Sequence, residues 1–298
     1  MTTEKFLVTG ATGETGRYTV QRLLEKGHAV RALVHKEDAR AEALRREGAE
    51  VVIGDLFEHD DAIRAADGAT AAYFCYPVRP GIIQTTAYFA DAAERAGLKA
   101  VINMSQISAR EDSKSHAARD HWIAERVFDW SGVPTVHLRP TFFSQWLLYP
   151  FARKTIVEQS IIDLPYGAGR HAPIAAEDQA RLIAALLADP VAHVGKTYTL
   201  HGPTELDQRG IAAAISEVLG RTISYQPLTI PEYRDRLEKF GLPAFLVQHF
   251  CAIAVDYQNG IFSGADKLIA EVTGVPPMTV QDFVASHRGA FDSLDVAA

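Results

Sequence analysis

The chain has 298 residues, of which 47% are hydrophobic and 22% are charged, proportions that are typical of a globular protein and argue against disordered or fibrous structure. Its 37 acidic residues outnumber 30 basic ones, giving a net charge of -7, and no basic run is long enough to bind a phosphate backbone. We therefore expect no nucleic-acid partner. The sequence has no apolar leader and no apolar stretch of about 18 residues, so we also expect no membrane association and a cytoplasmic location.

Short apolar runs alternate with helix-like stretches in the first half of the chain. We predict strands at Lys5–Thr9, His28–Val34, Glu50–Ile53, Ala69–Cys75, Lys99–Met104 and Thr135–Leu138. Helices are predicted to begin near Thr15, Ala39, Asp60, Ile82 and Ser115. Parallel neighbouring strands need a crossover helix, so this alternation predicts an α/β Rossmann fold with a doubly wound parallel sheet of six strands.

After Pro140 the pattern becomes mostly helical and is interrupted by Pro and Gly. A helix is predicted at Glu177–Ala188, and the strand-like segment Lys196–Leu200 is a candidate to return to the main sheet. Amphipathic helices are predicted at Asp207–Gly220 and Ile230–Phe240. We divide the chain into an NAD(P)-binding Rossmann domain, residues 1–140, and a smaller substrate or lid region, residues 141–298.

A glycine-rich loop follows the first predicted strand and leads directly into a predicted helix. Gly10 permits a tight turn, Gly13 lets backbone approach a pyrophosphate, and Gly16 lets the helix pack closely on the strand. The N-terminus of the helix then faces the anion. Strand, glycines and helix in this order predict a dinucleotide-binding loop, whose expected cofactor contacts are Gly10, Thr12, Gly13, Glu14, Thr15 and Gly16.

The residues after the second predicted strand normally decide between NAD and NADP, because an acidic residue there binds the ribose 2′-hydroxyl and repels a 2′-phosphate. In this chain His35 and Lys36 occupy that place, and Arg40 follows one turn later. These cations favour NADP(H) as the cofactor. The alternative is that His35 and Lys36 are only solvated, since Glu37 and Asp38 lie beside them.

Three segments resemble the NmrA-like family, an atypical branch of the short-chain dehydrogenases: Gly10-Ala-Thr-Gly-Glu-Thr-Gly16, Gly54-Asp55-Leu56 and Gly195–Pro203. His121-Trp-Ile-Ala-Glu125 is similar to the family's His-x-x-x-Glu helix, and Arg139-Pro140 is similar to the end of its sixth strand. The resemblance covers nearly the whole chain. It implies either an NAD(P)H-dependent quinone or dye reductase, or a catalytically silent redox sensor that binds the cofactor and then a protein partner.

The resemblance also implies positions around the cofactor. Tyr76, Pro77 and Ser105 would flank the nicotinamide. From their topological position after the third predicted strand, Asp55 and Leu56 would lie beside the adenine. For Ser105 the alternative is a serine that caps the turn after its strand.

Ordinary short-chain dehydrogenases use Tyr-x-x-x-Lys to protonate a developing alkoxide. Aligned on Glu125, this chain has Ala117 at the tyrosine position and His121 at the lysine position. Reduction of a simple ketone is therefore not expected. Hydride addition to a quinone or a dye leaves a stabilised product, and water or His121 could supply any proton, so Ser105 and His121 are the candidate catalytic residues.

The aromatic segment after Pro140 is suited to line a pocket for a planar acceptor. The expected substrate contacts are His116, Phe142, Phe143 and Trp146, although the three aromatic side chains fit an apolar core equally well. His171 lies on a predicted loop and is expected to be a surface histidine, the alternative being that it enters the cleft. Cys75 and Cys251 show no CxxC spacing, and His116 and His121 do not share a helical face, so no metal site is expected.

These observations favour an NADPH-dependent oxidoreductase that transfers hydride to a small conjugated acceptor such as a quinone or a dye. Its partner would be this small molecule, and a homodimer remains open. The alternative is a catalytically silent NAD(P) sensor that binds another protein. An isomerase or synthase that borrows the fold is a third interpretation.

Overall fold

The computed structural model describes residues 4–294. The chain forms two compact units. Unit 1 comprises the described residues up to Asp112 together with Ala117–Arg139 and Ala176–Thr199, and unit 2 comprises Ser113–His116, Pro140–Ala175 and the described residues from Leu200 on.

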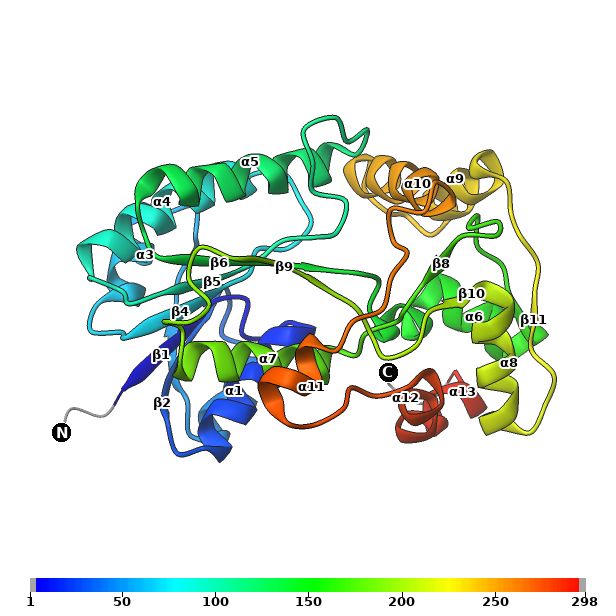
Figure 1. Cartoon of the computed structure of the whole chain (residues 1–298), viewed down its shortest axis with the longest axis horizontal. Coiled ribbons are helices and arrows are strands. Elements are labelled where there is room, and N and C mark those ends of the chain that lie inside the picture. The colour runs from blue at the N-terminus through cyan, green and yellow to red at the C-terminus, as the bar shows by residue number, and fades with distance from the viewer. Residues whose placement is uncertain (1–3, 295–298) are drawn as a thin grey trace. The chain divides into compact units, whose positions relative to one another are not determined.

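Unit 1 is built on a seven-stranded sheet (Figure 1). The strands are β1 (Lys5–Val8), β2 (Ala29–Val34), β3 (Glu50–Ile53), β4 (Ala71–Phe74), β5 (Val101–Met104), β6 (Thr135–Pro140) and β9 (Thr197–Leu200). Their order in the sheet is β3-β2-β1-β4-β5-β6-β9, and β1 pairs in parallel with both β2 and β4. The strand order therefore reverses between β1 and β4, the place where open α/β sheets bind their ligands.

Helices cover both faces of this sheet (Figure 1). They are α1 (Glu14–Glu25), α2 (Ala39–Glu47), α3 (His59–Ala66), α4 (Ile82–Arg95), α5 (His116–Ser131) and α7 (Ala176–Ala188). Helix α1 packs against α7, and α3 packs against α4. On the side of α4 and α5 the core includes Phe74, whose ring lies 4.8 Å from that of Phe89 and 5.4 Å from that of Phe128. Burial of such large aromatic side chains is a main source of stability for the sheet.

The α/β Rossmann prediction is confirmed. Each of the six predicted strands of the first half is present, and no strand end differs from its prediction by more than two residues. The sheet has a seventh strand, β9, which pairs beside β6 and arises from the strand-like segment predicted at Lys196–Leu200. A sheet of six strands was therefore one strand too few.

Unit 2 is mostly helical. Its helical elements are η1 (Ser144–Leu148), α6 (Pro150–Gln159), α8 (Gln208–Leu219), α9 (Ile230–Lys239), α10 (Ala244–Gln258), α11 (Leu268–Thr273), α12 (Val280–Ser286) and α13 (Arg288–Asp292). Four short strands form two pairs: β7 (Ile161–Ile162) with β11 (Ser224–Tyr225), and β8 (Arg170–His171) with β10 (Leu206–Asp207). Helix α9 begins with a capping box, in which Thr229 and Glu232 bond to each other's backbone N–H groups.

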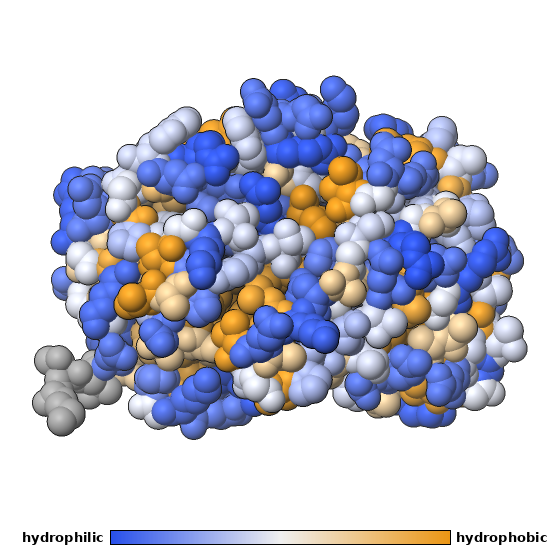
Figure 2. All heavy atoms as spheres, viewed as in Figure 1, coloured by the Kyte–Doolittle hydropathy of each residue, from blue (hydrophilic) through white to orange (hydrophobic). Residues whose placement is uncertain are grey.

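The surface seen in Figure 2 is mixed, with hydrophilic residues spread among smaller hydrophobic areas. Among residues 4–294, no helix is both long enough and apolar enough to cross a membrane.

Candidate functional site

The glycine loop after β1 brings backbone unusually close to backbone. Gly10 has φ +59°, in the left-handed region, and its carbonyl accepts a hydrogen bond of 2.9 Å from the Gly13 N–H. A Cβ atom on Gly16 would lie only 2.2 Å from the Gly10 oxygen. The close approach at Gly16 is thus to the loop itself. The sequence had instead suggested a close approach to the strand. The approach to the loop leaves the first N–H groups of α1 at the sheet edge, where they suit an anion.

The two side chains beside these glycines point elsewhere. The Thr15 hydroxyl is buried and lies 2.8 Å from the Tyr73 hydroxyl, under the sheet edge. Glu14 is exposed and pairs with Arg17 at 2.9 Å. Any contact that Glu14 and Thr15 make with a dinucleotide would therefore come from their backbone.

Unit 1 contains a cavity of about 480 Å³ at the carboxyl edge of β1, β2, β3 and β4, a volume within the range of small-molecule sites. Most of the predicted cofactor residues line it: Gly10, Thr12, Gly13, His35, Arg40, Asp55, Leu56, Tyr76 and Pro77. The other lining residues are Leu33, Val34, Gly54, Cys75 and Arg79. The predicted residues that do not line the cavity are Glu14, Thr15, Gly16, Lys36 and Ser105.

Charges of both signs lie on the side of the cavity after β2. His35 Nδ1 is 3.5 Å from Asp55 Oδ2. Arg40 binds one oxygen of Asp38 through two nitrogens, at 3.1 and 2.6 Å, and this pairing holds the pKa of Asp38 below its usual value. Asp38 also caps α2 by accepting from the Arg40 and Ala41 N–H groups. Arg40, one of the cations expected to favour NADP, thus already has one internal partner.

Arg79 is a cavity residue that the sequence analysis did not identify. It follows β4 in the same loop as Tyr76, and its Nε donates a hydrogen bond of 2.8 Å to the Tyr76 hydroxyl. Burial raises the pKa of Tyr76, with Arg79 opposing that rise. The signal was available in principle, because Arg79 lies only two residues after Pro77 at a strand end where ligands gather.

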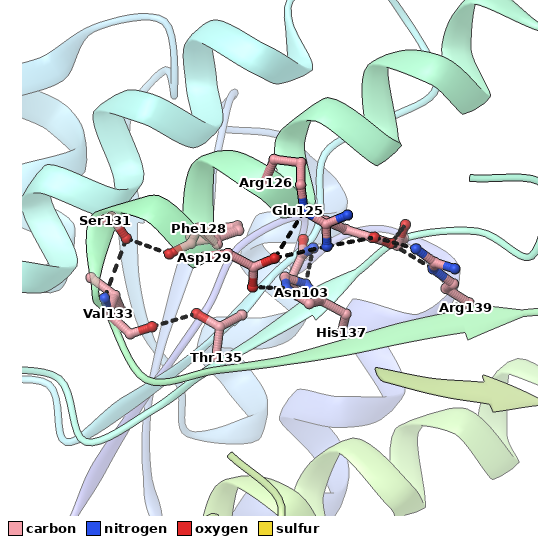
Figure 3. Close-up of polar contacts among 11 residues, drawn as sticks. Asn103, Glu125, Arg126, Phe128, Asp129, Ser131, Val133, Thr135, His137 and Arg139 are labelled. Atoms are coloured by element: carbon pink, nitrogen blue, oxygen red, sulfur yellow. Dashed lines mark hydrogen bonds and ion pairs between the residues drawn. The ribbon is translucent and has the colours of Figure 1, made fainter. Parts of the chain in front are cut away.

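Ser105 belongs to a second cluster in unit 1, of which Figure 3 labels Glu125 and Arg139. Its hydroxyl donates to Glu125 Oε1 over 2.5 Å. Arg139 at the end of β6 donates to both oxygens of Glu125, at 2.9 and 2.5 Å. Glu125 is fully buried, and its hydrogen bonds raise the pKa of Arg139. The sequence identified Glu125 and Arg139 only as motif positions, because separations of 20 and 14 residues do not predict a contact.

The two candidate histidines of α5 lie in different surroundings. Ala117 and His121 are buried in unit 1. His116 belongs to unit 2, is exposed, and donates its backbone N–H to Gln248 Oε1 over 3.0 Å. The structure therefore does not group His116 with His121.

The aromatic residues after β6 pack within unit 2. Phe142 is half-buried and stacks on Phe262, with ring centres 4.4 Å apart. Phe143 forms a β-bridge with Ile174. Trp146 is buried, and its indole N–H has no hydrogen-bond partner among the described residues.

His171 is not the surface residue that the sequence suggested, and that expectation is wrong. It lies on β8 rather than on a loop and is fully buried. Its Nδ1 is 2.7 Å from the Tyr257 hydroxyl, which also accepts from Gln208 Nε2 over 2.9 Å. Burial lowers the pKa of His171 to about 3, with nearby His201 adding to the shift.

Comparison with known proteins decides the family. The model of the NmrA-like family matches residues 2–260. The chain belongs to this family. It is 30% identical over 291 residues to an NAD(P)H azoreductase from Xenophilus azovorans, and the match covers 96% of this chain and 98% of the relative.

Two solved structures share the fold of this NmrA-like protein. The NADPH-dependent quinone oxidoreductase of Escherichia coli, complexed with NADPH, has a TM-score of 0.84 at 24% identity and covers 95% of this chain and 99% of its own. The triphenylmethane reductase of Citrobacter sp., complexed with NADP(H), has a TM-score of 0.82 at 23% identity with the same coverage, 95% and 99%. The family resemblance inferred from the sequence is confirmed.

Proposed function

We propose that this NAD(P)H-dependent reductase uses NADPH and transfers its hydride to a small conjugated acceptor, such as a quinone or a dye. The observation that carries the proposal is the cavity of unit 1, where the glycine loop and the N-terminus of α1 meet the cations that follow β2 and β4. The names of the relatives support it: one is an NAD(P)H azoreductase, and the structural neighbours reduce quinones or triphenylmethane dyes.

The preference for NADPH rests on the cations of the cavity. The oxygens of a 2′-phosphate can accept two hydrogen bonds at once from one guanidinium. Arg40 carries such a group and lines the cavity just after β2. Its present partner, Asp38, would have to share it with the phosphate. Lys36 is exposed next to His35 and adds positive charge to the approach.

The choice of acceptor rests on the absence of the tyrosine that ordinary short-chain dehydrogenases use as a proton donor. The cofactor supplies the hydride when it is bound. At the position of the usual tyrosine stands the buried methyl group of Ala117, which has no proton to give. A quinone or a dye needs little help from a strong acid, because its reduced form is already stabilised. The contribution of the protein is then mainly to orient the acceptor.

Acceptor-dependent oxidation of NADPH tests the proposal. Purified protein would be mixed under anaerobic conditions with NADPH or NADH and with a quinone, an azo dye or a triphenylmethane dye, while cofactor absorbance is followed. We expect turnover with at least one acceptor and a higher kcat/KM with NADPH. Tight binding of NADPH without turnover on any acceptor would instead favour the cofactor sensor that binds a protein, which Ala117 would also suit.

A further inference from the structure

We propose that Glu125 and Arg139 fix the Ser105 hydroxyl as a hydrogen-bond acceptor toward its ligand, and that the group it recognises is the carboxamide N–H of the nicotinamide. The inference rests on the proposed use of NADPH. Glu125 and Arg139 are then positioning residues, and the Ser105 hydroxyl accepts a hydrogen bond from the cofactor rather than donating one.

Ser105 lies at the carboxyl edge of the sheet in unit 1. It directly follows β5, and within the paired strands Phe74 of β4 lies opposite Asn103 of β5. Two residues further along each chain come Tyr76 and Ser105, so the two reach the carboxyl edge at the same level. Tyr76 lines the cavity of unit 1. Ser105 therefore stands next to the end of the cavity, one strand further along the edge.

The Ser105 proton points toward Glu125. A carboxylate has acceptor sites only, so the proton of a 2.5 Å contact with Glu125 Oε1 must come from Ser105. A serine hydroxyl has one proton and two lone pairs. Once that proton is used toward Glu125, the oxygen offers a ligand only its lone pairs.

Two arginines hold Glu125 in its place. Arg139 donates hydrogen bonds to both Glu125 oxygens, and the Arg126 guanidinium lies 4.0 Å from Oε2 (Figure 3). Oε1 thus accepts from both Ser105 and Arg139 Nε, while Oε2 accepts from the second Arg139 nitrogen, and these contacts hold the buried group in one orientation. Ser105 cannot easily turn its proton elsewhere, because that would leave a buried carboxylate oxygen without one of its donors.

A second set of side-chain contacts holds α5 against the strands that carry this cluster. Asp129, one helical turn after Glu125, lies 3.1 Å from His137 Nε2 on β6, and His137 Nδ1 lies 3.0 Å from the Asn103 amide on β5 (Figure 3). Helix α5 is thus joined to β6 at two successive turns. Such support restricts Ser105 to one geometry, which favours preorganised binding of a ligand group.

Because Ser105 can only accept a hydrogen bond from its ligand, it distinguishes the two ends of a carboxamide. The nicotinamide carboxamide carries one carbonyl acceptor and one NH₂ donor, and a Ser105 oxygen that only accepts would select the NH₂ side. The same serine could not give a proton to the acceptor during hydride transfer. The proton of the reduced product would then come from water or from His121.

Binding of a cofactor analogue tests this polarity. In the oxidised 3-acetylpyridine analogue of NADP, an acetyl group replaces the carboxamide, so the carbonyl remains and the N–H donor is lost. The Kd of NADP⁺ and of the analogue would be measured by calorimetry for the wild type, Ser105→Ala and Ser105→Thr. We expect the wild type to prefer NADP⁺ by about tenfold beyond the preference of Ser105→Ala, the size of one hydrogen bond, and Ser105→Thr to keep the preference.

Glu125→Gln tests the positioning role. An amide presents one acceptor oxygen where Glu125 presents two, so it cannot satisfy Ser105 and both Arg139 nitrogens together, and the preference for NADP⁺ should fall while binding of the analogue is retained. If Glu125→Gln does not fold, as judged by circular dichroism, the comparison of wild type with Ser105→Ala still decides. An unchanged preference in Ser105→Ala would overturn the inference but leave the proposed function intact. A wild type that binds neither NADP⁺ nor NADPH would overturn both.

Discussion

A buried carboxylate of unit 1, Glu125, is held by an ion pair, whereas two buried histidines of unit 2, His171 and His249, are held by neutral hydrogen bonds. In unit 1 the fully buried Glu125 is neutralised by Arg139. In unit 2 the buried His171 bonds to the Tyr257 hydroxyl, and the buried His249 bonds to Ser115 at 2.7 Å. An ion pair fixes the direction of its hydrogen bonds, whereas a buried neutral histidine resists protonation. The two units should therefore respond differently to pH and to loss of a partner.

Acid should weaken unit 2 most. Burial lowers the pKa of His171 to about 3 and that of His249 to about 4, although Asp256 opposes the second shift. Their folded pKa values lie below the unfolded value, so the stability they confer is full above about pH 6.5 and is lost as the pH falls toward the folded values. Near pH 5 each should cost roughly 2 kcal/mol in the free energy of unfolding.

Denaturant unfolding at neutral pH and near pH 5 measures this loss. His171→Phe removes one of the titrating groups, so its unfolding free energy should fall less with acid than that of the wild type. Replacement of the exposed His116 by Gln should leave the wild-type dependence in place. Equal losses in the wild type and His171→Phe would show that buried histidines do not set the acid response.

Removal of the carboxylate in unit 1 should have the next largest effect. Glu125→Ala leaves Arg139, three-quarters buried, without its partner, and we expect a loss of about 3 kcal/mol in the free energy of unfolding. The counterpart in unit 2, Ser115→Ala, removes a neutral bond to His249 and should cost about 1 kcal/mol. Denaturation curves would compare the two variants, and equal losses would contradict the contrast between the units.

Gly16→Ala tests the close backbone packing of the glycine loop in unit 1. The new Cβ would collide with the Gly10 oxygen, so the loop must shift, and we expect weaker NADPH binding together with a stability loss of about 2 kcal/mol. Gly27→Ala is the matched control, because Gly27 has φ +80° but nothing within 4 Å of the added atom. That control should lose stability and keep its Kd for NADPH. NADPH binding that is equally weak in both variants would refute a specific role for the loop.

The smallest expected effect concerns cofactor choice. Arg40→Ala should raise the Kd of NADPH about tenfold and leave that of NADH nearly unchanged, because only NADPH carries the 2′-phosphate. Arg46→Ala, an exposed change on the same helix α2, serves as the control. Parallel titrations with both cofactors would measure the ratio, and an equal loss for NADH would mean that Arg40 does not read the phosphate.

The sequence could predict what depends on neighbours in the chain. The strands, the helices and the order of Gly10, Gly13 and Gly16 are local patterns, and from them the fold class followed. The cluster of Ser105, Glu125 and Arg139 joins segments 20 and 14 residues apart, and the contact between His171 and Tyr257 spans 86 residues. Such contacts are created by the tertiary packing of elements, so residue type and spacing alone could not show them.

The most direct test of the account is whether hydride passes from NADPH to an acceptor on this protein. Single-turnover reduction of a quinone would be followed with ordinary NADPH and with NADPH that carries deuterium at the transferred position. We predict that quinone reduction keeps pace with NADPH oxidation and is slowed by deuterium, and that it is faster with NADPH than with NADH. A protein that binds NADPH tightly but transfers hydride to no quinone, azo dye or triphenylmethane dye would contradict the account.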